Sequence, residues 1–275
     1  MLTVLMPKTK AALLVIGIAM VAAAADVAAQ TPTALAAGAA RLPDVVGIRP
    51  GISAQEAYDL LKARSPGAKI GVGQFPVAGV TDKPVPVSMA VKIIDTDPPE
   101  ILTVWLTTPP SKQVVWAVGR QIEFEQNKQL LRSTVIGGLR QKYGPVVDSN
   151  QRQQFWAFDE QGNRIESADL KTANCMNRAN WSLFVTPPSD TTYDFVTPLL
   201  YAPGPRNPCD SLVEVKATLD SLANPDFVLR VTVIVSDLGL ARRSQEAYQA
   251  FLTKAATAKD KEELEKARER KGPAF

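Results

Sequence analysis

Residues 87–107, VSMAVKIIDTDPPEILTVWLT, contain two runs in which apolar side chains recur at every second position. The recurring positions are Val87, Met89, Val91 and Ile93 in the first run and Leu102, Val104 and Leu106 in the second. A period of two is typical of a strand with one buried face. The acidic, proline-bearing stretch 94–100 between the runs predicts a polar turn, so the two strands are expected to pair antiparallel.

Further alternating runs extend this pattern along the chain. Strands are predicted over 114–124, 154–159, 181–186, 212–220 and 227–236. Helices are predicted over 53–64, 126–143 and 241–270, because apolar residues there recur every three or four positions or because helix formers dominate. The first helix has a capping pair, Ser53 with Glu56. Gly137 and Gly138 inside the second helix suggest a close contact between that helix and a sheet.

The order of these elements predicts the fold class. It reads α-βββ-α-ββββ-α, with consecutive strands rather than alternating strands and helices, which favours an α+β fold of antiparallel sheet with helices packed on one face. The helix-and-three-strands pattern occurs about twice, and the tetrapeptide at 55–58 recurs at 245–248. Two related units are therefore a hypothesis, a first at 45–145 and a second at 146–258, followed by a charged helical tail at 259–275.

The first residues are typical of a secretory signal peptide. Lys8 and Lys10 precede an uncharged apolar run at 11–25, and Val27 and Ala29 supply the small side chains that signal peptidase requires before Gln30. The run is shorter than the roughly 20 residues of a membrane-spanning helix, so cleavage is favoured over a retained anchor. We expect a signal peptide at 1–29, a flexible tether at 30–44, and a mature protein in the periplasm or outside the cell.

Composition excludes several classes of function. The formal charge is +3 without clustered basic residues, which disfavours nucleic-acid binding. Histidine is absent, which removes histidine acid–base catalysis, the Ser-His-Asp triad and histidine-ligated zinc. No catalytic, cofactor-binding or metal-binding residues are predicted, and no cofactor is expected.

Cys175 and Cys209 are the two cysteines of the chain. In an exported protein such a pair predicts a disulfide, which here closes a proline-rich loop and contributes roughly 3–4 kcal/mol of stability. A redox-active pair is the alternative, although the spacing is not that of a Cys-x-x-Cys motif.

Four tryptophans lie in predicted strands, and core packing is the favoured interpretation for most of them. Trp105 differs, because it alternates with the apolar residues of its strand and shares a face with Thr103 and Thr107. These three residues are the candidate partner-contact site, on a face of the sheet expected to be open. The loop at 187–208 is a second candidate contact surface.

Two segments carry a resemblance to known exported domains. The segment at 46–53 (VGIRPGIS), with its following helix, and the segment at 139–156 (LRQKYGPVVDSNQRQQFW) resemble elements of SmpA/OmlA-type outer-membrane assembly lipoproteins and of β-lactamase-inhibitor-like domains. The chain also looks like an exported protein of proteobacterial type. The resemblance implies helices on one face of an antiparallel sheet and a role in binding proteins; it supplies no functional residues, and the chain has no lipid-attachment cysteine near the cleavage site.

The sequence therefore favours a non-catalytic periplasmic binding or scaffolding protein, with another envelope protein as its partner. An envelope hydrolase that uses carboxylates or a Ser–Lys pair is an alternative. A small-ligand carrier, which requires an apolar cavity, is a further alternative.

Overall fold

The computed structural model describes residues 41–75, 84–166, 208–222 and 224–269. They all belong to one compact unit that begins at Ala40. The expected signal peptide, most of the expected tether and the expected strand at 181–186 lie outside the described residues.

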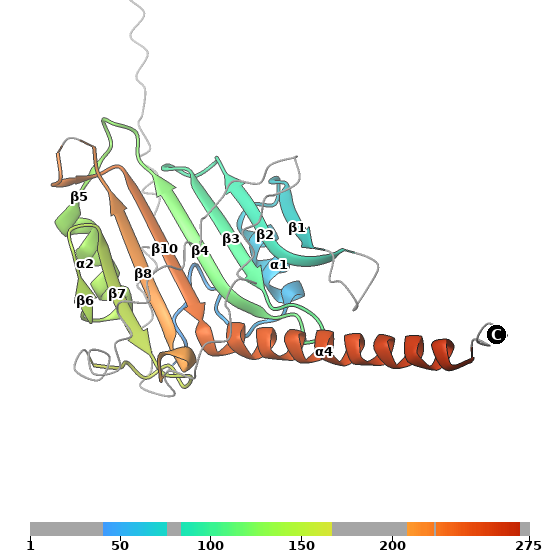
Figure 1. Cartoon of the computed structure of the whole chain (residues 1–275). Helices are drawn as coiled ribbons and strands as arrows, with labels where there is room; N and C mark the ends of the chain where they lie inside the picture. Colours follow the sequence, from blue (N-terminus) through green and yellow to red (C-terminus); the bar gives the residue numbers. More distant parts are fainter. Residues whose placement is uncertain (1–40, 76–83, 167–207, 223, 270–275) are drawn as a thin grey trace, which may run out of the picture. The chain divides into compact units, whose positions relative to one another are not determined.

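The described part of the chain contains three α-helices and ten strands (Figure 1). In chain order the elements are α1 (Ala54–Arg64), β1 (Ile70–Phe75), β2 (Val85–Ile93), β3 (Glu100–Leu106), β4 (Val115–Glu123), β5 (Leu130–Leu131), α2 (Arg132–Tyr143), β6 (Asp148–Ser149), β7 (Gln153–Phe158), the 3-10 turn η3 (Pro208–Ser211), β8 (Val213–Asp220), β9 (Phe227–Val228), β10 (Arg230–Asp237) and α4 (Leu238–Glu269).

Eight strands form one antiparallel sheet in the order β1-β2-β3-β4-β10-β8-β7-β6, and β5 pairs with β9 in a small separate sheet. This arrangement confirms the predicted α+β class. The large sheet consists of two series, α1-β1-β2-β3-β4 and α2-β6-β7-β8-β10, joined where β4 pairs with β10. The first series has four described strands rather than the expected three, because β1 was not predicted. The second series also has four described strands, which include the unpredicted two-residue β6. In this order α2 precedes β6 as α1 precedes β1.

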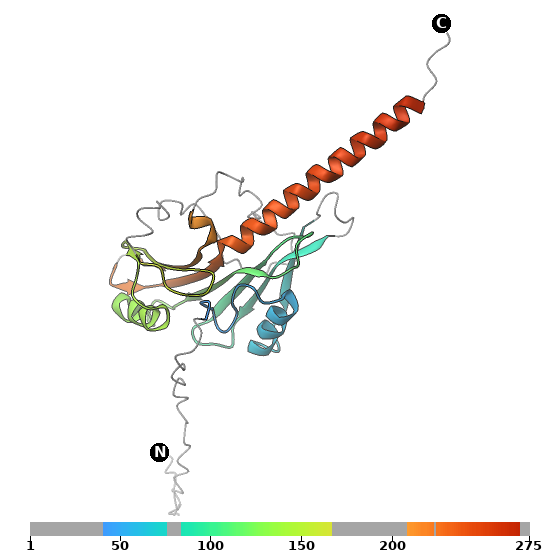
Figure 2. The same ribbon diagram turned by 90° about the horizontal axis from the view of Figure 1, so that it is seen from below.

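The two faces of the sheet are covered differently (Figure 2). The main core lies on the face that carries α1 and α2, and it includes Leu61 of α1, Leu102 of β3 and Trp156 of β7. On the opposite face the first residues of α4, Leu240 and Ala241, pack against a smaller cluster. The sheet is therefore buried on both faces where α4 begins.

Local interactions explain where the first two helices start. The Ser53 side chain accepts a hydrogen bond from the Glu56 N–H at 3.1 Å, as the capping pair predicts. Helix α2 starts at Arg132, later than expected, because the two residues before it form β5. The expected contact at Gly137 and Gly138 is wrong: both glycines are exposed, and a Cβ built on either meets no atom within 4 Å.

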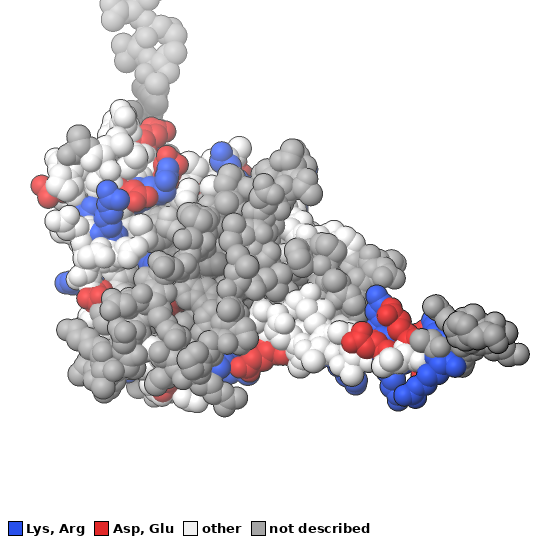
Figure 3. Space-filling model, viewed as in Figure 1, with Lys and Arg blue, Asp and Glu red and all other residues white. Residues whose placement is uncertain are grey.

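Helix α4 is anchored at its start and exposed along its end. The Asp237 carboxylate accepts a hydrogen bond from the Leu240 N–H at 2.8 Å and caps the helix. Every side chain over 256–266 is exposed, and charges of both signs lie side by side there (Figure 3), with ion pairs such as Lys266 with Glu262. Among the described helices, none is long and apolar enough to cross a membrane.

Candidate functional site

The predicted contact residues Trp105, Thr103 and Thr107 do not lie on an open face. Their exposed fractions are 4%, 0% and 3%. Trp105 packs in the cluster that contains Trp116 and the start of α4, and the Thr107 hydroxyl donates to the Lys112 carbonyl at 2.7 Å. The alternation placed Trp105 opposite Leu102 correctly, but the expectation of an open face is wrong, because α4 packs there.

The predicted disulfide and the predicted contact loop fall largely outside the described residues. Cys175 and the loop at 187–207 are outside them. Cys209 is inside them, in η3, where it is 2% exposed and packs with Ala157 and Leu212. The described residues therefore show what Cys209 packs against, but they do not include most of the predicted contact loop.

A group of three charged side chains on the α1 side of the sheet is the best candidate for a functional site. Its centre is Glu100, the first residue of β3, which shares a face with Leu102 because side chains two apart in a strand point the same way. The Glu100 side chain is 1% exposed. A carboxylate at such depth needs charged or hydrogen-bonding partners.

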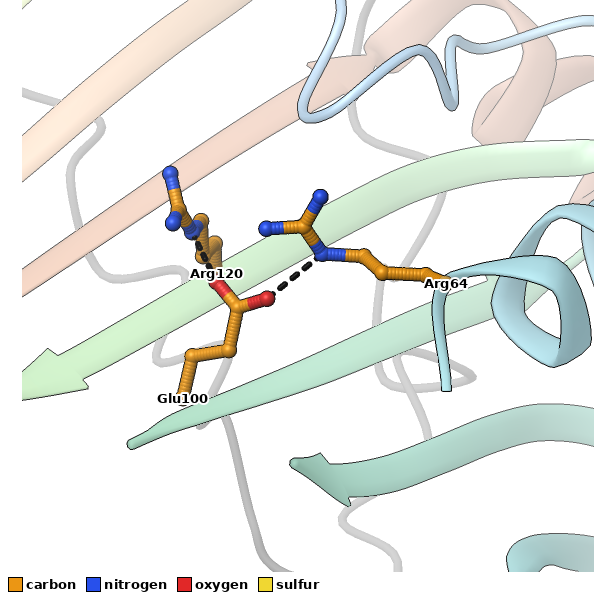
Figure 4. A network of polar contacts seen from close by, with 3 residues as sticks. All are labelled: Arg64, Glu100 and Arg120. Carbon is orange, nitrogen blue, oxygen red and sulfur yellow. Dashed lines mark hydrogen bonds and ion pairs between the residues drawn. The ribbon is translucent and has the colours of Figure 1, made fainter. Parts of the chain in front are cut away.

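Two arginines from different elements supply these partners (Figure 4). Arg64 is the last residue of α1, and its Nε donates to Glu100 Oε1 at 2.5 Å. Arg120 projects from β4, and its Nε donates to Glu100 Oε2 at 2.5 Å. Each carboxylate oxygen thus holds one guanidinium, and we call Arg64 and Arg120 the arginine pair.

The arginine pair retains unused donors. Glu100 binds the Nε atoms, and the described residues form no other hydrogen bond or ion pair with either arginine side chain. The two arginine side chains are 33% and 32% exposed, so solvent reaches them. Their four terminal nitrogens carry hydrogen-bond donors that Glu100 does not use, and the three side chains together carry one net positive charge.

The charge of Arg120 also acts on Tyr143, the last residue of α2. The Tyr143 hydroxyl, at the end of α2, donates to the Asp44 carbonyl at 2.9 Å. Burial raises the pKa of Tyr143 far above its ordinary value, the Asp44 charge adds to the shift, and the Arg120 charge opposes it. Tyr143 therefore stays neutral beside the arginine pair and contributes no competing negative charge.

This arrangement suits the binding of an anion. Guanidinium groups with free terminal nitrogens recognise two-oxygen anions such as carboxylates and phosphates through parallel hydrogen bonds. Among the described residues, no group of three or more Cys, Asp or Glu side chains has the geometry to hold a metal ion. The charge of the arginine pair therefore suits the recognition of an anionic group.

The sequence interpretation missed this site, although a signal was present. Residues 94–100 suggested a polar turn, yet Glu100 has the parity of Leu102 and Val104, and Arg120 has the parity of Val118. A charged residue at a buried position of an alternating strand is a clue to a paired charge.

No protein-family model matches the chain, and neither a curated protein nor a solved structure shows significant similarity to it.

Proposed function

We propose that the protein is an exported, non-catalytic binding protein that captures an anionic group of its ligand or partner at the arginine pair. One observation carries this proposal: in the described part of the chain, the side chains of Arg64 and Arg120 form hydrogen bonds only with the buried Glu100, through Nε, and they are 33% and 32% exposed.

Binding to another envelope protein is the form of this function that the sequence favours. A partner that presents a carboxylate side chain or chain end to the arginine pair would form charge-assisted hydrogen bonds with it. Trp105 has no part in this proposal, because it is buried.

Export rests on the first residues of the chain. Lys8, Lys10, the apolar run at 11–25 and the small residues before Gln30 support signal cleavage and a periplasmic location. N-terminal sequencing of the protein from a periplasmic extract is expected to begin at Gln30; a chain beginning at Met1 in the cytoplasmic fraction would contradict export.

A disulfide between Cys175 and Cys209 is part of the same proposal. The burial of Cys209 and the lack of a free cysteine in the described part of the chain support it. Alkylation without reduction is expected to leave the mass of the purified protein unchanged, whereas two alkyl groups added without reduction would contradict it.

Calorimetric titration with N-acetylglycine, a minimal peptide carboxylate, tests the binding proposal. We expect wild-type protein to bind it and Arg64→Lys, which keeps the charge but loses the planar fork, to bind on the order of tenfold more weakly. Arg140→Lys is the matched control, because Arg140 is an exposed arginine of α2. Lack of binding by the wild type, or equal binding by wild type and Arg64→Lys, would overturn the proposal.

A further inference from the structure

Glu100 does more than hold the two arginines, because its charge is part of the site. Both of its oxygens accept a hydrogen bond from an Nε–H, as an ionised carboxylate does. Its side chain is 1% exposed, so water screens this negative charge poorly. Any anion on the terminal nitrogens of the arginine pair therefore lies within a few ångströms of a fixed negative charge.

The charge balance discriminates between anions. Attraction to the arginine pair grows in proportion to the charge of the anion, and so does repulsion by Glu100. The cost of removing the anion from water grows more steeply with its charge. A site with one net positive charge thus matches a singly charged group and offers too little attraction to a doubly charged one.

We infer that Glu100 makes the arginine pair selective for singly charged carboxylates over doubly charged phosphate monoesters. This inference rests on the proposed function, since it requires that the arginine pair bind anions. Glu100 is a specificity-determining and positioning residue in this scheme: it fixes the two guanidinium groups and sets the net charge that they present.

The contacts of Glu100 support its role in positioning the two guanidinium groups. Glu100 Oε1 takes Arg64 and Oε2 takes Arg120, so one buried side chain orients two forks that come from α1 and β4 (Figure 4). Rigid donors on secondary structure recognise a two-oxygen group at a lower entropy cost than free side chains do. A carboxylate presents two oxygens in one plane, which suits such forks.

The experiment compares the affinities of two probes in wild type and Glu100→Gln. The probes are N-acetylglycine and methyl phosphate, which is doubly charged at about pH 7.5 because its second pKa is about 6. We expect wild type to prefer N-acetylglycine on the order of tenfold, and Glu100→Gln to reduce this preference on the order of tenfold. Loss of orientation weakens both probes together, so the ratio of their affinities isolates the charge effect.

A second measurement needs no variant and covers the case in which Glu100→Gln does not fold. Wild type is expected to bind methyl phosphate more tightly at about pH 5, where the probe is singly charged, than at about pH 7.5, while dimethyl phosphate, singly charged at both, stays constant. The affinities of wild type for acetate and for N-acetylglycine distinguish a free carboxylate from the end of a peptide. Tighter binding of N-acetylglycine indicates a peptide ligand, and equal binding of both probes indicates a free carboxylate.

The outcomes separate the two proposals. If wild type binds no probe, the proposed function fails and the inference falls with it. If wild type binds anions but Glu100→Gln leaves the ratio of affinities unchanged, or if methyl phosphate binds equally at both pH values, the anion site stands and its selectivity through Glu100 is overturned.

Discussion

The Ser244 hydroxyl of α4 accepts a hydrogen bond from the backbone N–H of Thr108 at 2.9 Å, and both side chains are buried. This bond joins the loop after β3 to a helix that follows it by more than a hundred residues. It fixes the start of α4 against the face of the sheet that carries Trp105.

Ser244→Ala is therefore expected to destabilise the protein by about 1–3 kcal/mol, because it leaves the buried Thr108 N–H without its acceptor. Urea unfolding measures the change. Thr253→Ala is the control, since the Thr253 hydroxyl bonds only to an exposed carbonyl of its own helix. Equal stability of Ser244→Ala and wild type would show that α4 is not held in this way.

Trp105→Ala is expected to lower the free energy of unfolding by about 3–5 kcal/mol, as other large-to-small changes of buried aromatic residues do. Thermal melting measures the loss. Tyr58→Ala, at an aromatic residue that is 38% exposed, is the comparison and should change stability far less. A Trp105→Ala protein that melts with the wild type would restore the open face that the sequence suggested.

Replacing the two exposed glycines of α2 should stabilise the protein. Gly137→Ala and Gly138→Ala are each expected to add up to about 1 kcal/mol, because alanine loses less backbone entropy and both positions have open space for a Cβ. Gly162→Ala is the opposite control: its φ is +85° and a Cβ would lie 2.9 Å from the Arg41 backbone. Destabilisation by the α2 substitutions would indicate an unseen contact of that helix.

Glu214 gives the protein a pH dependence that can be isolated. Burial raises the pKa of its carboxyl from the ordinary 4.5 to about 7, and Lys216 partly opposes the shift. The folded protein therefore keeps a proton that the unfolded chain releases, so the stability contributed by this group is complete below about pH 4.5 and is lost as the pH rises through about 7.

Glu214→Gln removes this titration. We expect the variant to match wild type near pH 4.5 and to exceed its free energy of unfolding by at most about 3 kcal/mol near pH 8. Urea unfolding at both pH values tests this, with the exposed Glu263→Gln as control. A difference between variant and wild type that is the same at both pH values would contradict the assignment.

The longer strands β2, β3, β4, β7, β8 and β10 follow from the sequence, because a period of two records burial directly. The sequence interpretation placed Glu100 in a polar turn, although its parity with Leu102 corresponds to the core face. What covers each face does not follow, since the contact of Ser244 with Thr108 is long-range and leaves no local pattern. The short β1 contains Gly71 and Gly73, which weaken the strand signal that would have predicted it.

The convergence of Arg64 on Glu100 also could not be predicted. The pattern of α1 predicts an exposed Arg64 at the end of the helix. Only the packing of α1 against β3 brings the Arg64 Nε to the Glu100 carboxylate. The parity of Glu100 and Arg120 was a signal present in the sequence, whereas the contact of Arg64 with Glu100 depends on tertiary structure.

The most direct test of the anion site is nuclear magnetic resonance of the arginine Nε–Hε groups during titration with N-acetylglycine. We predict that the Arg64 and Arg120 signals shift together and saturate at one concentration, while the Arg140 signal stays in place. Signals of Arg64 and Arg120 that do not move, or that move no more than that of Arg140, would contradict the anion site and the function proposed from it.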